Sequence, residues 1–308
     1  MSSEARRFSL DQWQDPSRFA VRLAPAVFVW LWSTGFIGAK YGLPYAEPFT
    51  LLLYRMLATL VLLALVAGWM KSRWPSAKEA AHTAITGLLV HGCYLGGVFY
   101  AIQDGMPAGL TALVVGLQPL VTAVAAVIVL REAIAMRQWL GLVLGLVGVS
   151  LVLLEKMGGT AQVASFPLWT LLWAVIALIG ISLGTVYQKR FCQGVELVPG
   201  AFIQYCAAAC LFAAGAFAFE TRVVSWDVQL LLAMGWLVLG LSVGAILLLM
   251  QLIRRGAASQ VASLFYLVPP VTALQAYILF DERLGALALC GGLFSILGVA
   301  LVVVKRSR

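Results

Sequence analysis

Charged side chains are scarce in this sequence. Asp, Glu, Lys and Arg make up 11% of the 308 residues, against 62% hydrophobic residues, whereas soluble domains carry about 25% charged residues. So little charge cannot cover a soluble surface, which excludes a soluble enzyme, a disordered protein and a disulfide-stapled secreted domain. Lipid offers no hydrogen-bond partner to exposed backbone groups, and no segment shows the alternation of a β-barrel. We therefore expect helices that span a lipid bilayer.

Metal, disulfide, leader and nucleic-acid patterns are also missing. The five cysteines fall in or at the ends of apolar runs without CxxC spacing, so we expect free thiols, no metal and no cofactor. Residues 1–22 contain no apolar h-region, which argues against a cleaved signal peptide. The net charge of +8 comes from short Lys and Arg clusters beside apolar runs. Because these clusters form no basic groove with interleaved aromatics, nucleic acid is not an expected partner.

The distribution of basic residues orients the predicted spans. In the ten-span reading, 16 Lys and Arg residues fall on one side of the membrane, 4 fall on the other, and Arg55 lies inside a span. The positive-inside rule places the basic side, and with it both termini, in the cytoplasm. The predicted spans lie near residues 24–43, 47–70, 81–103, 107–130, 139–154, 167–188, 198–219, 228–251, 257–280 and 284–304.

An internal repeat relates the two halves of the chain. Residues 117–123 read Leu-Gln-Pro-Leu-Val-Thr-Ala, and residues 267–273 read Leu-Val-Pro-Pro-Val-Thr-Ala. At the same offset Glu132 falls on Glu282. An offset of 149 further pairs Ser33, Gly35 and Lys40 with Ser182, Gly184 and Lys189. Shared Pro, Glu, Gly and Lys in register are not expected by chance between leucine-rich helices.

The repeat predicts three parts: a cytoplasmic N-terminal segment (1–23), a first five-helix repeat (24–154) and a second five-helix repeat (167–304). Five is an odd number of spans, so the second repeat enters the membrane the opposite way up. Inverted repeats of this kind are typical of alternating-access transporters. The predicted fold class is therefore an all-α integral membrane protein with ten transmembrane helices, arranged as two inverted five-helix repeats.

The repeat pattern Ala-x₃-Ala-x₄-Leu-x-Pro-x-Val-Thr-Ala, followed by a glutamate and a Gly-rich helix, occurs at 108–152 and again at 258–302. It resembles the EamA family of the drug/metabolite transporter superfamily. Residues 99–102 and 105–109 are further similar to bacterial exporters of aromatic and other amino acids. The resemblance implies a place in the bacterial cytoplasmic (inner) membrane. It also implies a central cavity, lined mostly by the first, third, fourth, sixth, eighth and ninth helices.

His91 is the most informative single residue. An ionisable group in the middle of a span is expensive and by default functional. Tyr94 lies one turn further along the same helix face. A neutral imidazole offers one donor and one acceptor, enough to hold the amino or carboxyl group of a substrate. The alternative is a histidine that bonds a backbone carbonyl and never contacts substrate.

Arg55 lies about 10 Å along the second span from Pro48, given the rise per residue of a helix. An unpaired arginine at this depth is costly. Glu282 or Asp281, at the outer end of the ninth span, is the expected partner. A structural or gating anchor is therefore favoured for Arg55 and Glu282, over contact between Arg55 and a substrate carboxylate.

Prolines fall at matching positions of the two repeats. Pro119 in the fourth span, and Pro269 with Pro270 in the ninth, remove backbone donors and free nearby carbonyls. Bent or broken helices at corresponding sites of two halves point to a transport site, so these prolines are structural or gating candidates. Gln118 and Gln275 are polar groups on the same two spans and are substrate-binding candidates. The alternative is that the prolines only shape the packing.

Aromatic side chains recur on the spans expected to line the cavity. Aromatic walls with few fixed charges suit moderately apolar zwitterions, whereas phosphorylated sugars and nucleotides need several Lys or Arg. We therefore expect a small-molecule substrate, an amino acid or a related metabolite. The aromatic substrate-binding candidates besides Tyr94 are Trp30, Tyr100, Trp173, Tyr187, Phe265 and Tyr266.

Acidic residues are missing from the middle of the spans, since all 13 fall in loops, tails or span ends by these boundaries. His91 is then left as the mid-membrane proton carrier. We expect facilitated, gradient-driven export. Proton-coupled efflux of drugs or of aromatic and cationic compounds is the alternative.

Two further patterns carry less weight. Gly-x-Ser-x-Gly occurs around Ser182 and Ser242 and matches the nucleophile pattern of serine hydrolases. Both copies lie inside apolar helices, so an intramembrane hydrolase is disfavoured and no catalytic residue is expected. Gly141-xxx-Gly145 allows close helix approach, within one chain or between two, which leaves monomer and homodimer both open.

Overall fold

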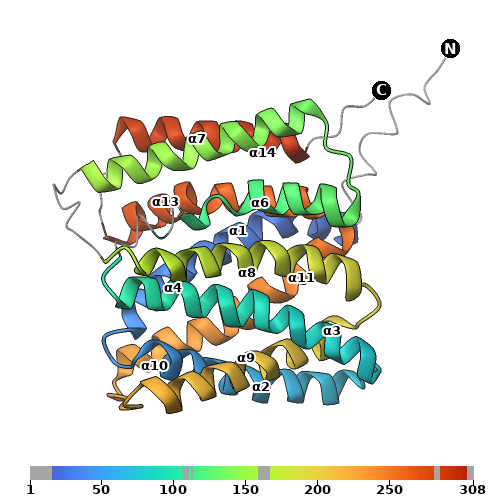
Figure 1. Ribbon diagram of the computed structural model, residues 1–308, viewed down its shortest axis with the longest axis vertical. Helices are drawn as coiled ribbons and strands as arrows, with labels where there is room; N and C mark the ends of the chain where they lie inside the picture. The colour runs from blue at the N-terminus through green and yellow to red at the C-terminus, as the bar shows by residue number, and fades with distance from the viewer. Residues whose placement is uncertain (1–15, 107–110, 112–113, 159–166, 281–284, 304–308) are drawn as a thin grey trace.

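The computed structural model describes residues 16–106, 111, 114–158, 167–280 and 285–303. This part of the chain is all-α, and its helices form ten rods (Figure 1). In chain order the rods are α1 (Pro16–Gly42); α2 (Pro48–Met70); α3 (Ala77–Gly87), η3 (Leu88–Cys93) and α4 (Tyr94–Gln103); α6 (Gln118–Ala125) and η4 (Ala126–Leu130); α7 (Met136–Gly158); α8 (Thr170–Phe191); α9 (Leu197–Phe219); α10 (Val228–Trp236), η5 (Leu237–Ala245) and α11 (Ile246–Arg255); α12 (Ala258–Ser263), η6 (Leu264–Leu267) and α13 (Val268–Phe280); and α14 (Ala286–Val303).

The lengths of the rods fit a membrane protein. Within the described residues, five helices are long and apolar enough to cross a bilayer, namely α2, the third rod, α8, α9 and the eighth rod. Shorter apolar helices of 10–17 residues occur in the other five rods. The predicted fold class, ten transmembrane helices in two inverted repeats, is confirmed.

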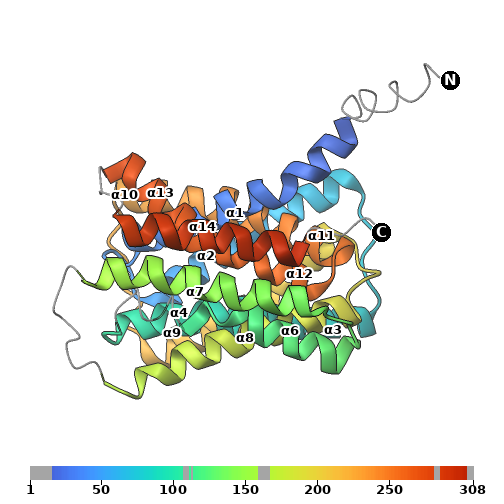
Figure 2. The same ribbon diagram turned by 90° about the horizontal axis from the view of Figure 1, so that it is seen from above.

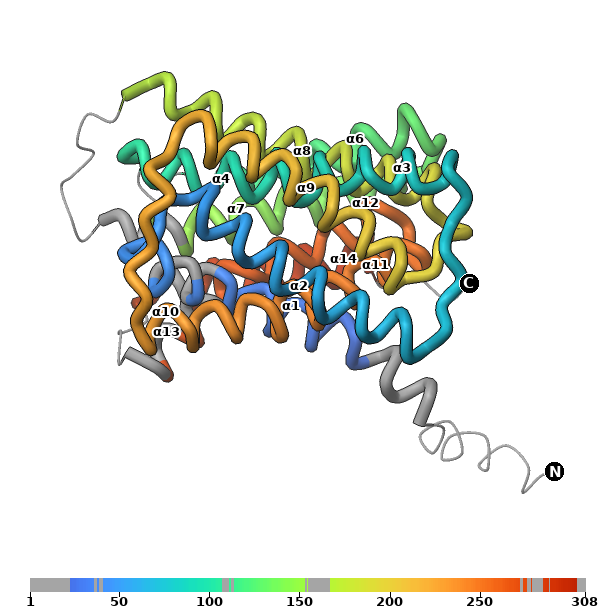
Figure 3. Tube along the Cα trace, turned by 90° about the horizontal axis from the view of Figure 1, so that it is seen from below, coloured from blue at the N-terminus to red at the C-terminus, as the bar shows by residue number. Residues whose placement is uncertain are grey.

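Two helix pairs close the molecule at the opposite ends of its long axis. α7 packs on α14 at one end, and α2 packs on α9 at the other (Figure 1). The views from above and below show that the axes of the rods are roughly aligned, whichever way the chain runs along each rod (Figures 2 and 3). Each pair joins equivalent rods of the two repeats, the fifth with the tenth and the second with the seventh. The pseudo-twofold axis that relates the repeats therefore passes through both pairs.

The ends of α2 and α9 show the inversion in hydrogen bonds. Glu47, just before α2, accepts a 2.7 Å bond from the N–H of Thr221, just beyond α9. Glu196, just before α9, accepts a 3.1 Å bond from the N–H of Arg73, just beyond α2. Each helix thus begins beside the end of the other, which is the arrangement expected of an antiparallel pair related by twofold symmetry.

Glycines allow α7 and α14 to touch through their backbones. A Cβ added to Gly141 would lie 2.6 Å from the carbonyl oxygen of Gly298, and one added to Gly148 would lie 2.5 Å from that of Gly291. Both distances are far below a van der Waals contact. The small residues of these helices therefore serve packing within one chain.

Three helix boundaries differ from those expected. α3 begins at Ala77 rather than at residue 81, because Ser76 and Glu79 form a capping box around its first turn. α7 runs over 23 residues from Met136 to Gly158, so it is longer at both ends than the span predicted at residues 139–154. α1 begins at Pro16 rather than at residue 24.

Candidate functional site

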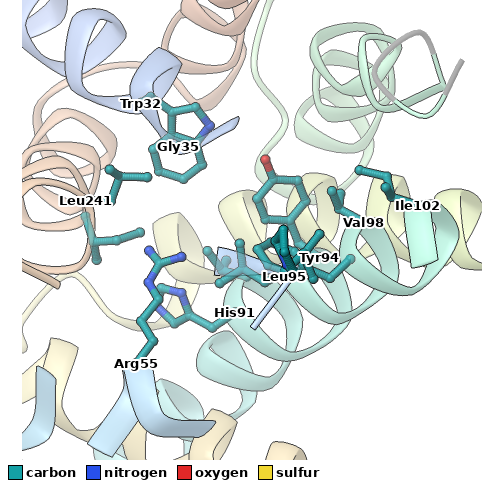
Figure 4. Close-up of a pocket in the computed structure, with 14 residues that line it drawn as sticks. Trp32, Gly35, Arg55, His91, Tyr94, Leu95, Val98, Ile102 and Leu241 are labelled. Atoms are coloured by element: carbon teal, nitrogen blue, oxygen red, sulfur yellow. The ribbon is translucent and has the colours of Figure 1, made fainter. Parts of the chain in front are cut away.

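A cavity of about 400 Å³ lies between the rods of the two repeats. It extends from Arg55 and His91, in the middle of their rods, to Leu43 and Pro44 in the α1–α2 linker and to Ile102 near the end of α4. Figure 4 shows the guanidinium of Arg55 beside the His91 ring. The described lining residues are Trp32, Gly35, Leu43, Pro44, Arg55, Val90, His91, Tyr94, Leu95, Val98, Phe99, Ile102, Leu241 and Ile246.

Five polar side chains meet at the inner end of this cavity, and we call Arg55, His91, Gln204, Tyr205 and Ser242 the central cluster. Arg55 donates from Nε to the Ser242 hydroxyl at 2.9 Å and also shares a side-chain hydrogen bond with Tyr205. The Tyr205 hydroxyl donates to the main-chain carbonyl of Ser242 at 3.2 Å, and its ring lies 4.5 Å from that of His91. The cluster therefore ties together the second, third, seventh and eighth rods.

Arg55 is 4% exposed, and its hydrogen-bond partners are neutral. Among the residues that the structure describes, no carboxylate contacts it. The partners expected from the sequence, Asp281 and Glu282, lie outside the described residues. An acidic partner for Arg55 therefore stays a prediction, and its described hydrogen-bond partners are Ser242 and Tyr205.

His91 is 1% exposed, and within the described part of the chain its Nε2 has no hydrogen-bond partner. The His91 ring nevertheless shares a side-chain hydrogen bond with Gln204 and lies close to the charge of Arg55. Gln204 occupies the position 149 residues after Arg55, so the two residues are equivalents in the repeat. The central cluster therefore lies on the pseudo-twofold axis.

The third and eighth rods, which contain His91 and Ser242 of the central cluster, change from α-helix to π-helix at these residues. The π segment η3 begins at Leu88 and η5 begins at Leu237, which is again a separation of 149 residues. A π turn widens the helix and misaligns its backbone bonds, and such turns are frequent at functional sites. His91 and Ser242 lie inside these two segments, so the repeat has duplicated the irregular backbone as well as the helices.

Aromatic rings form one wall of the cavity. Trp32 stacks on Tyr94 with centroids 6.2 Å apart, and both line the cavity. Phe265 packs edge-on against Trp32 at 5.1 Å and supports this wall from behind. Trp30, two residues before Trp32, is 47% exposed and is not among the described lining residues, while its backbone carbonyl accepts a bond from Gln275.

Tyr100 and Trp173 lie together near the ends of α4 and α8. Their rings are 5.5 Å apart, and the Trp173 indole donates to Asp104 at 3.1 Å. The Tyr100 hydroxyl donates to the carboxylate of Glu220 at 2.7 Å. The structure thus places both candidates near the end of the cavity at Ile102 rather than in the central cluster.

The remaining polar candidates lie apart from the cavity lining. Tyr187 bonds His82 at 2.7 Å, and each of these residues is in the half of its rod remote from Ile102. Gln118, Tyr266 and Gln275 are buried, and within the described residues each keeps one polar atom without a partner. None of these three residues is among the described residues that line the cavity with His91.

The predicted helix interruptions occur at matching positions. The fourth rod has a turn at residues 116–117, just before α6 and Pro119. The ninth rod passes through the 3-10 segment η6 just before Pro269 and Pro270. Each proline follows a break and so begins a new helical segment, where its missing N–H is tolerated.

Comparison with known proteins decides the family. The profile described as "EamA-like transporter family" matches residues 23–154 and again residues 168–304. The chain belongs to this family. The uncharacterized transporter YvbV of Bacillus subtilis (strain 168) is 27% identical over 297 residues, which cover 91% of this chain and 90% of YvbV. The uncharacterized inner membrane transporter YedA of Escherichia coli (strain K12) is 27% identical over 82% of this chain and 81% of its own.

A solved crystal structure shares the fold of this chain. It aligns with a TM-score of 0.75 over 91% of this chain and 95% of its own chain, at 21% sequence identity. At that identity the likeness shows the fold alone. The family match and the fold together establish a multi-pass membrane transporter of the drug/metabolite type.

Several cavity and cluster residues were not found from the sequence. Trp32, Gln204, Tyr205, Ser242 and Glu220 were not among the predicted site residues. The repeat offset of 149 was the signal that could have found Gln204 and Tyr205, because it aligns Gln204 with Arg55 and places Tyr205 directly after it. Nothing in the sequence marked Glu220 as part of a site, because a carboxylate at the end of a helix is common in ordinary loops.

Proposed function

We propose that the protein exports amino acids or similar small metabolites across the bacterial cytoplasmic membrane by alternating access, with both termini in the cytoplasm. The single observation that carries this proposal is the central cluster at the inner end of a cavity of about 400 Å³. The cluster lies where equivalent rods of two inverted repeats meet. Exchanging the conformations of the two repeats would turn access to such a site from one side of the membrane to the other.

The cavity chemistry supports a small, partly apolar substrate. Trp32, Tyr94 and Phe99 offer aromatic surface, and Arg55 with His91 offers polar contacts at the inner end. We place the two rings of Trp32 and Tyr94 against the apolar part of the substrate. Phosphorylated sugars and nucleotides fit poorly, because several basic groups would be needed to bind them.

The energy source follows from the groups that line the cavity. None of its described lining residues is acidic, so a buried carboxylate is not available there to exchange protons with a substrate. We propose facilitated export down the substrate gradient. Proton antiport through His91 is the alternative, and proton-coupled efflux of cationic drugs is disfavoured because Arg55 would repel them.

We propose no enzymatic activity. Ser242 accepts a hydrogen bond from Arg55 and Ser182 donates to the backbone of Gln118, so neither hydroxyl is bonded to a base among the residues that the structure describes. That arrangement argues against the hydrolase alternative, since a serine nucleophile needs a base within hydrogen-bond reach.

Exchange in proteoliposomes tests the proposal. Purified protein is expected to exchange labelled amino acids faster than protein-free liposomes, and His91→Ala is expected to lower the rate while expression stays normal. His82→Ala is the matched control, because His82 is the other histidine of the chain and bonds Tyr187 away from the cavity. Folded protein that exchanges no amino acid or related metabolite would contradict the proposal. A rate that depends on an imposed pH gradient would favour proton antiport.

A further inference from the structure

The central cluster holds a positive charge that nothing in the described part of the chain neutralises. Arg55 is 4% exposed and bonds only neutral groups, Ser242 and Tyr205. An arginine keeps its proton in proteins. A buried cation without a partner is strongly unfavourable, so the site is suited to accept an anion.

A second, independent observation points to a ligand at the same place. His91 lines the cavity, is 1% exposed, and within the described residues its Nε2 has no hydrogen-bond partner. A buried polar atom without a partner costs stability unless a ligand or water completes it. Figure 4 shows this ring next to the Arg55 guanidinium, so one ligand group can reach both side chains.

Among the described residues that line the rest of the cavity, only ring faces could contact a positive charge. Its described lining residues include Arg55, His91, Trp32 and Tyr94 as polar groups, and none of them is a carboxylate. The ammonium of an amino acid would lose its water here without gaining an anionic partner, which is unfavourable. A carboxylate on an apolar body would leave no charge unpaired.

We propose that the cavity prefers amphipathic monocarboxylates that carry no ammonium group, with the carboxylate held by Arg55 and His91 and the apolar body against Trp32 and Tyr94. The preference rests on the proposed export function and narrows its substrate class from amino acids and similar metabolites to those similar metabolites that lack an ammonium group. Arg55 is then a specificity-determining residue rather than only an anchor between rods.

The preference has a consequence for the driving force. Carrying a monoanion outward moves one negative charge across the membrane, and a potential of 100 mV, negative inside, then supports a concentration ratio of roughly 50-fold. A zwitterion gains nothing from the same potential. Export of anions would therefore need no coupling ion, in keeping with a described cavity lining that contains no acidic residue.

Three probes with the same benzyl group separate charge from shape: phenylpyruvate is an anion, phenylalanine a zwitterion and phenethylamine a cation. Each is titrated into the purified full-length protein by calorimetry. We expect phenylpyruvate to bind at least about tenfold tighter than phenylalanine, a difference of one decade in Kd, and phenethylamine to bind weakest. In proteoliposomes, a potassium diffusion potential is expected to change the flux of phenylpyruvate but not that of phenylalanine.

Substitutions of Arg55 test whether this residue causes the preference for an anion. Arg55→Gln is expected to bring phenylpyruvate and phenylalanine to similar affinities, and Arg55→Lys to retain the preference in part. Arg190→Gln is the matched control: it removes one positive charge, as Arg55→Gln does, but Arg190 is exposed in the last turn of α8. It is expected to bind the probes as the unmodified protein does.

The outcomes separate this inference from the function on which it rests. If phenylalanine exchanges and binds as tightly as phenylpyruvate, or if Arg55→Gln keeps the tenfold preference, the anion preference is overturned and the export function stands. If neither compound binds or exchanges, and other amino acids do not either, the export function itself is wrong. Should Arg55→Gln fail to fold, the ranking of the three probes on the unmodified protein decides.

Discussion

Replacing Glu220 by glutamine tests how the two repeats are joined at the end of the α2–α9 pair. The Glu220 carboxylate accepts four hydrogen bonds of 2.7 Å, from the N–H groups of Phe49 and Thr50, the Thr50 hydroxyl and the Tyr100 hydroxyl. A glutamine oxygen can keep the two bonds from Thr50, but the glutamine NH₂ then faces the N–H of Phe49, a donor against a donor. An unpaired buried N–H costs about 1–3 kcal/mol. The Glu220 charge also lies beside the positive N-terminal end of the α2 dipole, and removing it costs about 0.3–1 kcal/mol more.

We therefore expect Glu220→Gln to lower the apparent Tm of the protein in detergent by about 2–10 °C. Asp227→Asn is the matched control, because Asp227 caps α10 by accepting a 2.8 Å bond from the N–H of Gln229, and asparagine caps helices as well as aspartate. Its Tm is expected to stay within about 1 °C of that of the unmodified protein. An unchanged Tm for Glu220→Gln would refute the reasoning.

Two further changes probe the packing and the pH dependence. Gly148→Leu is expected to abolish the monodisperse peak in size-exclusion chromatography, because its Cβ would lie 2.5 Å from the carbonyl oxygen of Gly291. Gly68→Leu is the control and is expected to leave the peak unchanged, because nothing lies within 4 Å of a Cβ at this position. Equal elution profiles for the two variants would contradict the packing of α7 on α14. Hydrogen bonds from Thr221 lower the pKa of Glu47 below 4.5, so its stabilising contribution is present above pH 4.5 and is lost as the pH falls through the lowered pKa. The Tm deficit of Glu47→Gln at pH 7 is therefore expected to shrink in acid, and a deficit that grows in acid would contradict this assignment.

The order of the spans, their inversion and two of the central residues could be predicted from the sequence. Apolar runs define the rods, because lipid forces each exposed segment to be helical. Arg55 and His91 were noticed because a polar group inside an apolar run has a high energetic cost. The inversion followed from an odd number of spans in each repeat.

The contacts between rods could not be predicted in the same way. Arg55 meets Ser242 and Tyr205 because α2 packs on α9 and on η5, and a single sequence does not state which rods are neighbours. The choice of Trp30 over Trp32 shows a second limit. Positions two residues apart lie on nearly opposite helix faces, and an apolar span surrounded by lipid and protein has little periodicity to tell the faces apart. The π segments likewise have no signature in composition.

Cysteine labelling in intact cells tests the inverted arrangement most directly. Gln103 ends α4 and Arg255 ends α11, so they mark the corresponding ends of the third and eighth rods in the two repeats. In a background without native cysteines, a membrane-impermeant maleimide is expected to label Gln103→Cys from outside, and Arg255→Cys only after the membrane is permeabilised. Labelling of both positions from the same side would contradict two repeats of opposite orientation around one cavity.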